Sequence, residues 1–388
     1  MSICLSHLTA MEYYSRLRVA DGFCLDRSIP SVAERMKRAG AVPPNADLAD
    51  RFLPDHGRAE RLLSGELKGL TPPLHVLVTD RGKANSNRLT RCHLWSNRMP
   101  RSAFFRAAPN LPDLYLVSPA VMLFQLARDL SFERLVQLLH EACGTYATPF
   151  LSSSGHDSCA PLVSLRSLKQ FAAGVCDLRG GPSFAKALDW VIAPSASPME
   201  TVAVMLLCLP RRYGGYGLPL PRANHPLEIP VRAGHRDGRN VWTARDGYDR
   251  YGCGGYGGSG AGYPQGRTGG RTRVYGDLFW PEADIVLEYD GRLSHRGSEK
   301  VSKDYARCNA LESAGVTVLT ISAAQLKSVD QLDRVARRIA DGLGFRLRKR
   351  DYDECWMERH RGLRATLLPP GKACAAPWCG ELLGEVRA

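Results

Sequence analysis

The chain has 388 residues, of which 44% are hydrophobic and 23% are charged, so it is long enough for two or three globular domains with ample core. Lys and Arg outnumber Asp and Glu by 52 to 39, and the formal net charge of +13 favours polyanionic partners, nucleic acid above all. No apolar run approaches the about 18 residues of a membrane span and the N-terminus lacks a secretory layout, so we expect no membrane association and a cytoplasmic protein.

The N-terminal half is expected to be a mainly helical module with a small β element. Short helical stretches in residues 1–73 are broken by proline and glycine, and they indicate only a poorly defined helical region. Beyond them, Leu74–Val78 and Thr90–Trp95 have the composition of short strands. Ser118-Pro119 predicts the start of a helix, because Ser caps free amides and Pro is tolerated in the first turn, and a second helix runs from Phe132 to Gly144.

Residues 232–273 are rich in Gly, Arg and Tyr and contain too little apolar surface to fold alone. Two interpretations remain open: a disordered surface insertion, or a flexible arm whose arginines neutralise phosphates while its tyrosines stack on bases. Under the second interpretation Arg271 and Arg273 contact nucleic acid. We divide the chain into residues 1–73, 74–194, 195–346 and 347–388, with this segment as an insertion in the third part and a tail as the fourth.

The C-terminal half alternates helices and strands, which predicts an α/β domain built around a small mixed sheet with helices beside it. A strongly apolar helix spans residues 199–209. The last helix begins with Ser328 and has Gln331 three residues later, a capping-box spacing. The expected strands are Leu227–Val231, Val274–Phe279, Asp284–Tyr289 and Val316–Ile321.

Three acids occupy two of these neighbouring strands. Side chains alternate along a strand, so Glu288 and Asp290 point to the same side as Asp284. If the preceding strand pairs antiparallel through the short turn between them, Asp277 lies close to Glu288. Clustered carboxylates repel unless a cation lies among them, and their oxygens are the hard ligands that Mg²⁺ or Mn²⁺ prefers. The alternative is a solvated sheet edge whose acids discourage aggregation.

A longer pattern surrounds these acids. It comprises Asp277-x-x-Trp280-Pro281-Glu282, Glu288-x-Asp290-Gly291 and a downstream Asp304-x-x-Arg307. The region from Ser197 to Arg346 resembles the PD-(D/E)XK nuclease superfamily, and within it the bacterial endonuclease-like branch related to very-short-patch-repair endonucleases. Residues 74–146 resemble, more faintly, the middle region of AbiEi-type antitoxin proteins. The fold implied for the C-terminal part is a restriction-endonuclease-like mixed sheet flanked by helices.

The resemblance implies roles for individual residues. Asp277, Glu288 and Asp290 would form the metal site, although Asp290 stands where the superfamily usually has a lysine. The missing positive charge would come from Lys303, from Lys300 or from His295, which is otherwise an ordinary loop histidine. Glu200 would be either an outer acid of the site or a helix-capping residue. Arg292 and Arg307 would contact nucleic acid. The alternative for Arg307 is an ion pair with Asp304 on the same helix.

The function implied is a Mg²⁺-dependent or Mn²⁺-dependent DNA endonuclease, active in phage defence or DNA repair, that hydrolyses phosphodiester bonds. The N-terminal module would recognise DNA or a protein partner. The alternative is a non-catalytic DNA-binding or antitoxin-like regulatory protein that keeps the nuclease scaffold. A small-molecule hydrolase is disfavoured, because the sequence has no Gly-x-Ser-x-Gly elbow and no His-Glu-x-x-His zinc pair.

Overall fold

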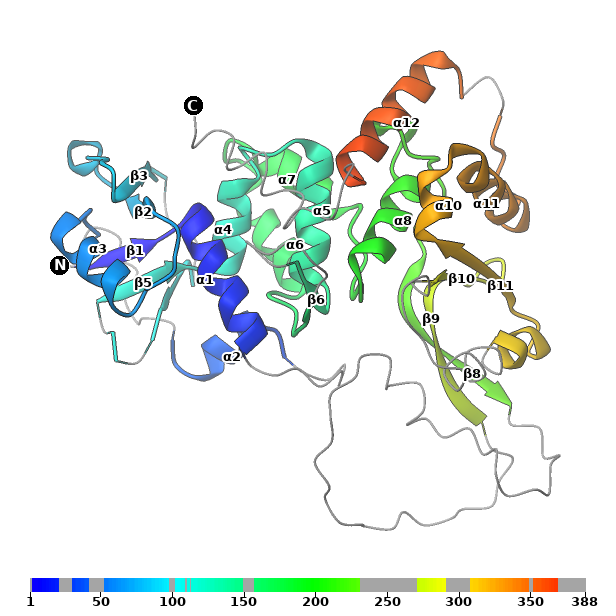
Figure 1. Ribbon diagram of the computed structural model, residues 1–388, viewed down its shortest axis with the longest axis horizontal. Helices are drawn as coiled ribbons and strands as arrows, with labels where there is room; N and C mark the ends of the chain where they lie inside the picture. The colour runs from blue at the N-terminus through cyan, green and yellow to red at the C-terminus, as the bar shows by residue number, and fades with distance from the viewer. Residues whose placement is uncertain are drawn as a thin grey trace, which may run out of the picture. The chain divides into compact units, whose positions relative to one another are not determined.

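The computed structural model of the chain describes residues 2–20, 30–41, 52–97, 102–108, 110–111, 113–148, 157–230, 271–290, 308–348 and 352–368. They form a mixed α/β structure, which confirms the class expected from the alternation of elements (Figure 1). The chain divides into two compact units. The first unit comprises Met1–Thr201 and Ala365–Ala388, and the second unit is Val202–Arg364.

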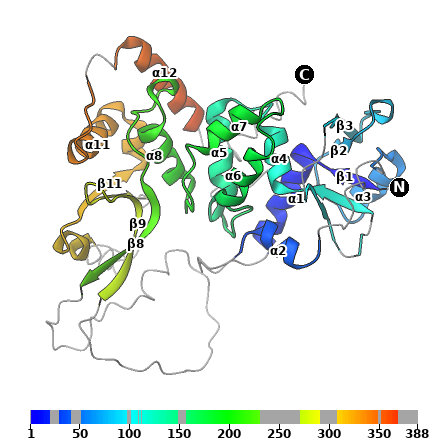
Figure 2. The ribbon, with the colours of Figure 1, turned by 180° about the vertical axis from the view of Figure 1, so that it is seen from behind.

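The first unit contains a five-stranded sheet in the order β3-β2-β1-β5-β4, which lies at the end of this unit that holds the N-terminus (Figure 2). Its middle strand, β1, is fully buried, and it pairs antiparallel with β2 and parallel with β5. It therefore joins the two halves of the sheet. The strands are β1 Ile3–Leu5, β2 Leu74–Val78, β3 Thr90–Leu94, β4 Phe104–Arg106 and β5 Leu114–Val117.

The position of β1 differs from the expected division of the N-terminal half. We expected residues 1–73 to form a separate helical region, whereas β1 lies in the same sheet as the two strands from residues 74–194 that flank it. Three apolar residues are too short a run to display the period of a strand or of a helix. Their role depends on the neighbours they meet in space, and this is why the sequence alone does not reveal it.

Serine residues begin several helices of the first unit. The Ser118 hydroxyl accepts a hydrogen bond from the amide of Val121 at 3.5 Å, which confirms the predicted cap of α4. Ser131 caps α5 in the same way, and Gly144 ends that helix as expected. The helices are α1 His7–Ala20, α2 Val32–Arg38, α3 His56–Ser64, α4 Pro119–Leu126, α5 Phe132–Cys143, α6 Leu165–Ala173 and α7 Gly181–Leu188, with the 3₁₀ turn η2 Arg81–Lys83 and the small sheet β6 Tyr146–Ala147 with β7 Asp157–Ser158.

The second unit contains a four-stranded mixed sheet in the order β11-β10-β9-β8. β8 and β10 each pair antiparallel with β9, whereas β11 is parallel to β10. This is the small mixed sheet that the sequence predicts. Its elements are β8 Arg222–Pro230, β9 Arg271–Trp280, β10 Ile285–Asp290, β11 Thr317–Ser322, α10 Ala323–Lys327, α11 Val329–Gly342, α12 Glu354–Leu367 and the 3₁₀ turn η3 Arg211–Tyr213, while α8 Pro198–Cys208 crosses the border between the units.

Different helices cover the two faces of this sheet. Val286 of β10 packs in a core cluster with Phe279 and with Leu311, which belongs to the helical stretch 308–313. The adjacent Ile285 points to the opposite face, where a Cβ at Gly342 would collide with its Cδ1. Glycine thus allows α11 to lie directly against β10. Because side chains alternate, Glu288 shares the face of Val286.

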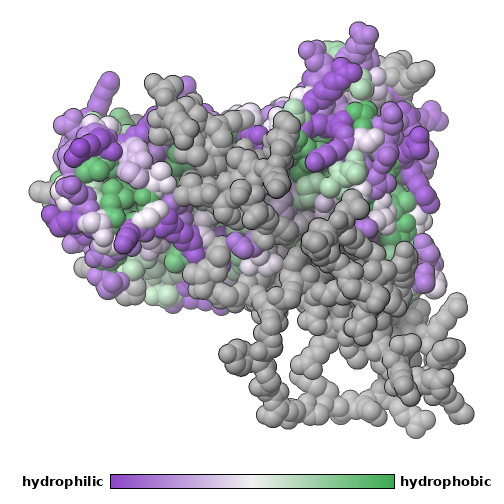
Figure 3. Space-filling model, viewed as in Figure 1, coloured by the Kyte–Doolittle hydropathy of each residue, from purple (hydrophilic) through white to green (hydrophobic). Residues whose placement is uncertain are grey.

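The helices α11 and α12 at the end of the chain present polar surfaces. Hydrophilic side chains gather over both helices on the face shown in Figure 3. On α11, Leu332, Ala336 and Ile339 are buried, and Arg334 and Arg338 are exposed. The hydroxyl of Ser328 accepts from the amide of Gln331, so the expected start of this helix is confirmed.

The helix α12 lies in residues 347–388, which we expected to be a tail. Its side chains bind main-chain carbonyls of the segment after η3. The Trp356 indole N–H donates to Gly215 O at 3.0 Å, and His360 Nδ1–H donates to Gly214 O at 2.7 Å. The Tyr352 hydroxyl donates to Tyr216 O at 3.0 Å. These three bonds fix the helix to the second unit.

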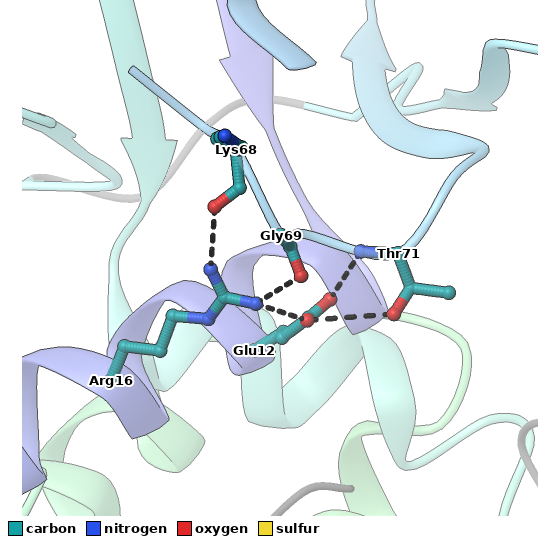
Figure 4. A network of polar contacts seen from close by, with 5 residues as sticks. All are labelled: Glu12, Arg16, Lys68, Gly69 and Thr71. Carbon is teal, nitrogen blue, oxygen red and sulfur yellow. Dashed lines mark hydrogen bonds and ion pairs between the residues drawn. The ribbon is translucent and has the colours of Figure 1, made fainter. Parts of the chain in front are cut away.

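A polar network in the first unit attaches the entry of β2 to α1 (Figure 4). The carboxylate of Glu12, only 2% exposed, accepts hydrogen bonds from the amide of Thr71 and from Arg16, both at 2.9 Å. The same guanidinium donates to the carbonyls of Lys68 and Gly69. Glu12 therefore accepts the hydrogen bond of the buried Thr71 amide. It also orients the Arg16 guanidinium, which binds two carbonyls of the loop that precedes β2.

Among the residues with described coordinates, no helix is both long enough and apolar enough to cross a bilayer.

Substitution of Glu12 tests the network. Glu12→Ala should lower the free energy of unfolding by roughly 2 kcal/mol, because the buried amide of Thr71 loses its acceptor. Glu12→Gln keeps an acceptor of the same shape and should cost less than half as much, since the Arg16 side chain is 43% exposed and its ion pair is screened. Urea denaturation measures both values, and equal losses for the two variants would contradict this account.

Candidate metal-binding and catalytic site

The hairpin of β9 and β10 brings the predicted acids into one place. Ile285 pairs with Trp280 and Leu287 with Leu278, in antiparallel register. This confirms the pairing expected from the short turn. Asp277 and Glu288 are the next residues of the two strands after the last pair, Leu278 with Leu287. Asp284 lies in the turn, at a left-handed φ of 50°, and not in the strand as we expected.

Asp277 lies where the regular pairing of β9 is interrupted. On the side of β10 the register ends at Leu278, and on the side of β8 it passes from Leu278 directly to Gly276 within these described strands. Asn224, the β8 residue at the skipped position, has a φ of 49°, a conformation that Asn tolerates better than most residues. The interruption lets the Asp277 carboxylate turn toward β10.

The two central carboxylates are buried beside each other. Asp277 is 4% exposed and Glu288 is 5% exposed. The Tyr289 amide donates to Asp277 Oδ2 at 2.9 Å, so this carboxylate lies against the peptide bond between Glu288 and Tyr289. Burial penalises each negative charge, and the proximity of a like charge adds to the penalty. The pair is costly to fold unless a cation or proton compensates it.

Asp290 lies farther along β10, at the half-buried end of the strand. It pairs in register with Ser322 of β11, the residue that caps α10. Its charge acts within the site: burial raises the pKa of the Tyr289 hydroxyl, and the negative charge of Asp290 raises it further. The position at which the resembled superfamily has a lysine thus adds negative charge to this end of the sheet.

The remaining predicted residues are not brought to these acids by any described contact. Glu200 belongs to the first unit, where it is 4% exposed and accepts from the Ala196 amide at 2.9 Å and from the Ser197 hydroxyl at 3.0 Å, which is the capping role left open by the sequence. Arg273 forms an exposed cross-strand ion pair with Glu228 at 3.3 Å. The side chain of Arg271 and the residues Arg292, His295, Lys303 and Arg307 lie outside what the structure describes.

Sequence reasoning missed two groups of this site. The backbone amide of Tyr289 orients the Asp277 carboxylate, and Asn224 occupies the skipped position of β8. Main-chain donors leave no trace in a sequence. The Asn residue does carry a weak signal, because Asn within a strand pattern is unfavourable unless it adopts a special backbone conformation.

The donors present match the preference of Mg²⁺ or Mn²⁺ for carboxylate oxygens. Among the described side chains, no three His, Cys, Asp or Glu residues form a group that could hold a metal ion. Mg²⁺, however, keeps several waters and is typically held by only one or two carboxylates together with the phosphates of a substrate. Asp277 and Glu288 fit that requirement in donor type, number and burial.

Comparison with known proteins gives no match of any kind. No protein-family model matches the chain, no curated protein matches it, and no solved structure matches it. The resemblance of residues 197–346 to nucleases therefore stays a prediction.

A charge-removing substitution tests whether the acid pair is costly. Asp277→Asn keeps a side-chain oxygen that can accept the hydrogen bond of the Tyr289 amide, and it removes one of the two buried charges. In metal-free buffer the melting temperature of this variant should therefore equal that of wild type or exceed it by about 2–4 °C. Glu12→Gln, which removes the buried carboxylate that pairs with Arg16, is the comparison variant and should lower it. A fall of more than about 4 °C in Asp277→Asn, measured by scanning calorimetry, would show that this carboxylate stabilises the fold.

Proposed function

We propose that the protein is a metal-dependent DNA endonuclease whose active site is built on the hairpin of β9 and β10. The observation that carries the proposal is the buried pair of Asp277 and Glu288 on adjacent strands. Burial of two carboxylates on adjacent strands is costly, and acids in such surroundings occur most often at functional sites. The excess of 13 positive charges in the sequence provides long-range attraction for a polyanion.

The arrangement of the second unit supports a restriction-endonuclease-like scaffold. β9 and β10 form an antiparallel hairpin, β11 runs parallel to β10, and the helical stretch 308–313 precedes β11 in the chain. Helices lie on both faces of β10, as the contacts of Val286 and Ile285 indicate. The acids are thereby held on a rigid sheet, which suits the precise positioning that phosphodiester hydrolysis needs.

Each residue of the site has a distinct task under this proposal. Asp277 and Glu288 hold Mg²⁺, which supplies polarisation of the scissile phosphate and a lowered pKa of a bound water. The Tyr289 amide keeps the Asp277 carboxylate in one orientation. Asp290 cannot neutralise developing negative charge as a lysine would, but its carboxylate can accept a proton from the attacking water.

A second candidate function is DNA binding without cleavage, in the manner of a regulatory or antitoxin-like protein. The presence of Asp290 at the position of the usual lysine favours it, because a site lacking the positive charge loses part of its stabilisation of the transition state. The two candidates share the scaffold and the affinity for DNA. They differ in whether metal-dependent hydrolysis occurs.

A nicking assay on supercoiled plasmid separates the two candidates. In the presence of Mg²⁺ or Mn²⁺ the protein should convert the plasmid to open-circular or linear form, and Asp277→Asn or Glu288→Gln should lower the rate at least about 100-fold, since either change removes a metal ligand. Glu312→Gln, which alters an exposed acid of the same unit, should leave the rate unchanged. DNA binding without cutting in either metal would reject the endonuclease and favour the second candidate.

A further inference from the structure

Three histidines from distant parts of the sequence meet at the start of α1 in the first unit. The imidazole of His7 stacks on that of His93, with ring centroids 3.5 Å apart. His93 Nε2 and His75 Nδ1 lie 2.9 Å apart and share a hydrogen bond. Because β1 runs directly into α1, while His75 and His93 lie on the neighbouring strands β2 and β3, the sheet brings the three rings together.

A buried amide is directed at the same place. Gln125 of α4 is 3% exposed, and its Oε1 accepts from the backbone amide of His7 at 3.4 Å. Only the oxygen can accept, so this contact fixes which way the side-chain amide is turned. Its Nε2 is bonded to the same carbon and lies beside the helix start, and in the described part of the chain this buried donor has no hydrogen-bond partner. An unsatisfied buried donor costs about 1–3 kcal/mol.

The electrostatic surroundings are positive. The N-terminus of the 14-residue helix α1 carries partial positive charge from its aligned peptide groups. Burial lowers the pKa of His7 well below its usual value, and His93, His75, Arg128 and Arg91 lower it further. The pKa of His75 falls to about 4 and that of His93 to about 3, both chiefly through burial, with Arg91 adding to each. The three rings are therefore neutral at pH 7.

We propose that the start of α1 is a binding site for a phosphoryl group. The donors are Gln125 Nε2, the first-turn amides of α1 that follow His7, and the ring nitrogens outside the His75–His93 bond and the contact of His7 Nδ1 with Ser6 Oγ. Arg91 and the exposed Arg128 supply the charge. The phosphoryl oxygens provide the missing acceptor for the buried Gln125 amide, as anions commonly do at helix N-termini. The site lies within the first unit and is independent of the endonuclease proposed for the second.

Neutral imidazoles are also ligands for transition metals, but the surroundings disfavour a cation here. The two arginines and the helix N-terminus repel positive charge, and Gln125 presents a donor rather than an acceptor. The rings of His7 and His93 are stacked face to face, so their nitrogen lone pairs do not converge on one point. An oxyanion complements every one of these features.

Calorimetric titration of the full-length chain, in EDTA to silence the second unit, tests the proposal directly. Millimolar inorganic phosphate and sulfate should bind and raise the melting temperature, because each binds the folded state only. Thymidine 5′-monophosphate is titrated in a parallel experiment, and thymidine, which lacks the phosphoryl group, serves as its control. Tighter binding of the monophosphate than of free phosphate would assign the site to a nucleotide, and equal binding would assign it to free phosphate.

Two variants link binding to the named residues. Gln125→Glu places a carboxylate where the phosphoryl oxygens would lie, so phosphate binding should fall at least about tenfold, while the protein melts at a higher temperature than wild type. Arg128→Ala, at an exposed position that tolerates truncation, should weaken binding about three- to tenfold. Arg166→Ala, at an exposed arginine of α6, is the matched control and should bind as wild type does.

The proposal is overturned if wild type shows neither heat nor a thermal shift in millimolar phosphate and sulfate. It is also overturned if Gln125→Glu and Arg128→Ala bind phosphate as tightly as Arg166→Ala. A lower melting temperature in Gln125→Glu together with absent phosphate binding in wild type would show that Gln125 only packs the end of α4. In that case an ordered water satisfies its amide.

Discussion

Two carboxylates of neighbouring strands, those of Asp277 and Glu288, are almost entirely removed from water, and like charges so placed repel each other. Several features of the second unit hold these two groups in place. The Tyr289 amide binds one of the two groups, the skipped pairing beside Asn224 gives it room, and helices on both faces of β10 keep the strands in register. The skipped pairing in the sheet thus positions the same two acids to which the metal chemistry is assigned in the proposed function.

Elements with strong local signals could be predicted from the sequence. β2 begins and ends at the expected residues, and Ser118 caps α4 as its position before proline indicates. The spacing of the apolar residues along α11 indicates which of its side chains are buried. β1 and α12 could not be predicted, because β1 is three residues long and the bonds that Trp356 and His360 of α12 make go to the main-chain carbonyls of Gly215 and Gly214.

The candidate sites differ in the same way. A short turn forces β9 and β10 to pair. The register of this hairpin follows from the sequence positions on either side of the turn, and it predicts that Asp277 lies near Glu288. The cluster of His7, His75 and His93 joins three positions far apart in the chain, and only the order of strands in the sheet brings them together. Proximity within a hairpin is encoded locally, whereas proximity between sheet neighbours depends on the topology of the whole unit.

Metal binding is the property on which the function proposed for the second unit depends, and it can be measured without DNA. Titration of Mn²⁺ followed by its electron paramagnetic resonance signal should show one bound ion per chain. Asp277→Asn and Glu288→Gln should each weaken binding at least about tenfold, and the double variant should weaken it little more than either single one, because one ion shares both ligands. Undiminished Mn²⁺ binding in the double variant, or no binding in wild type, would contradict the account.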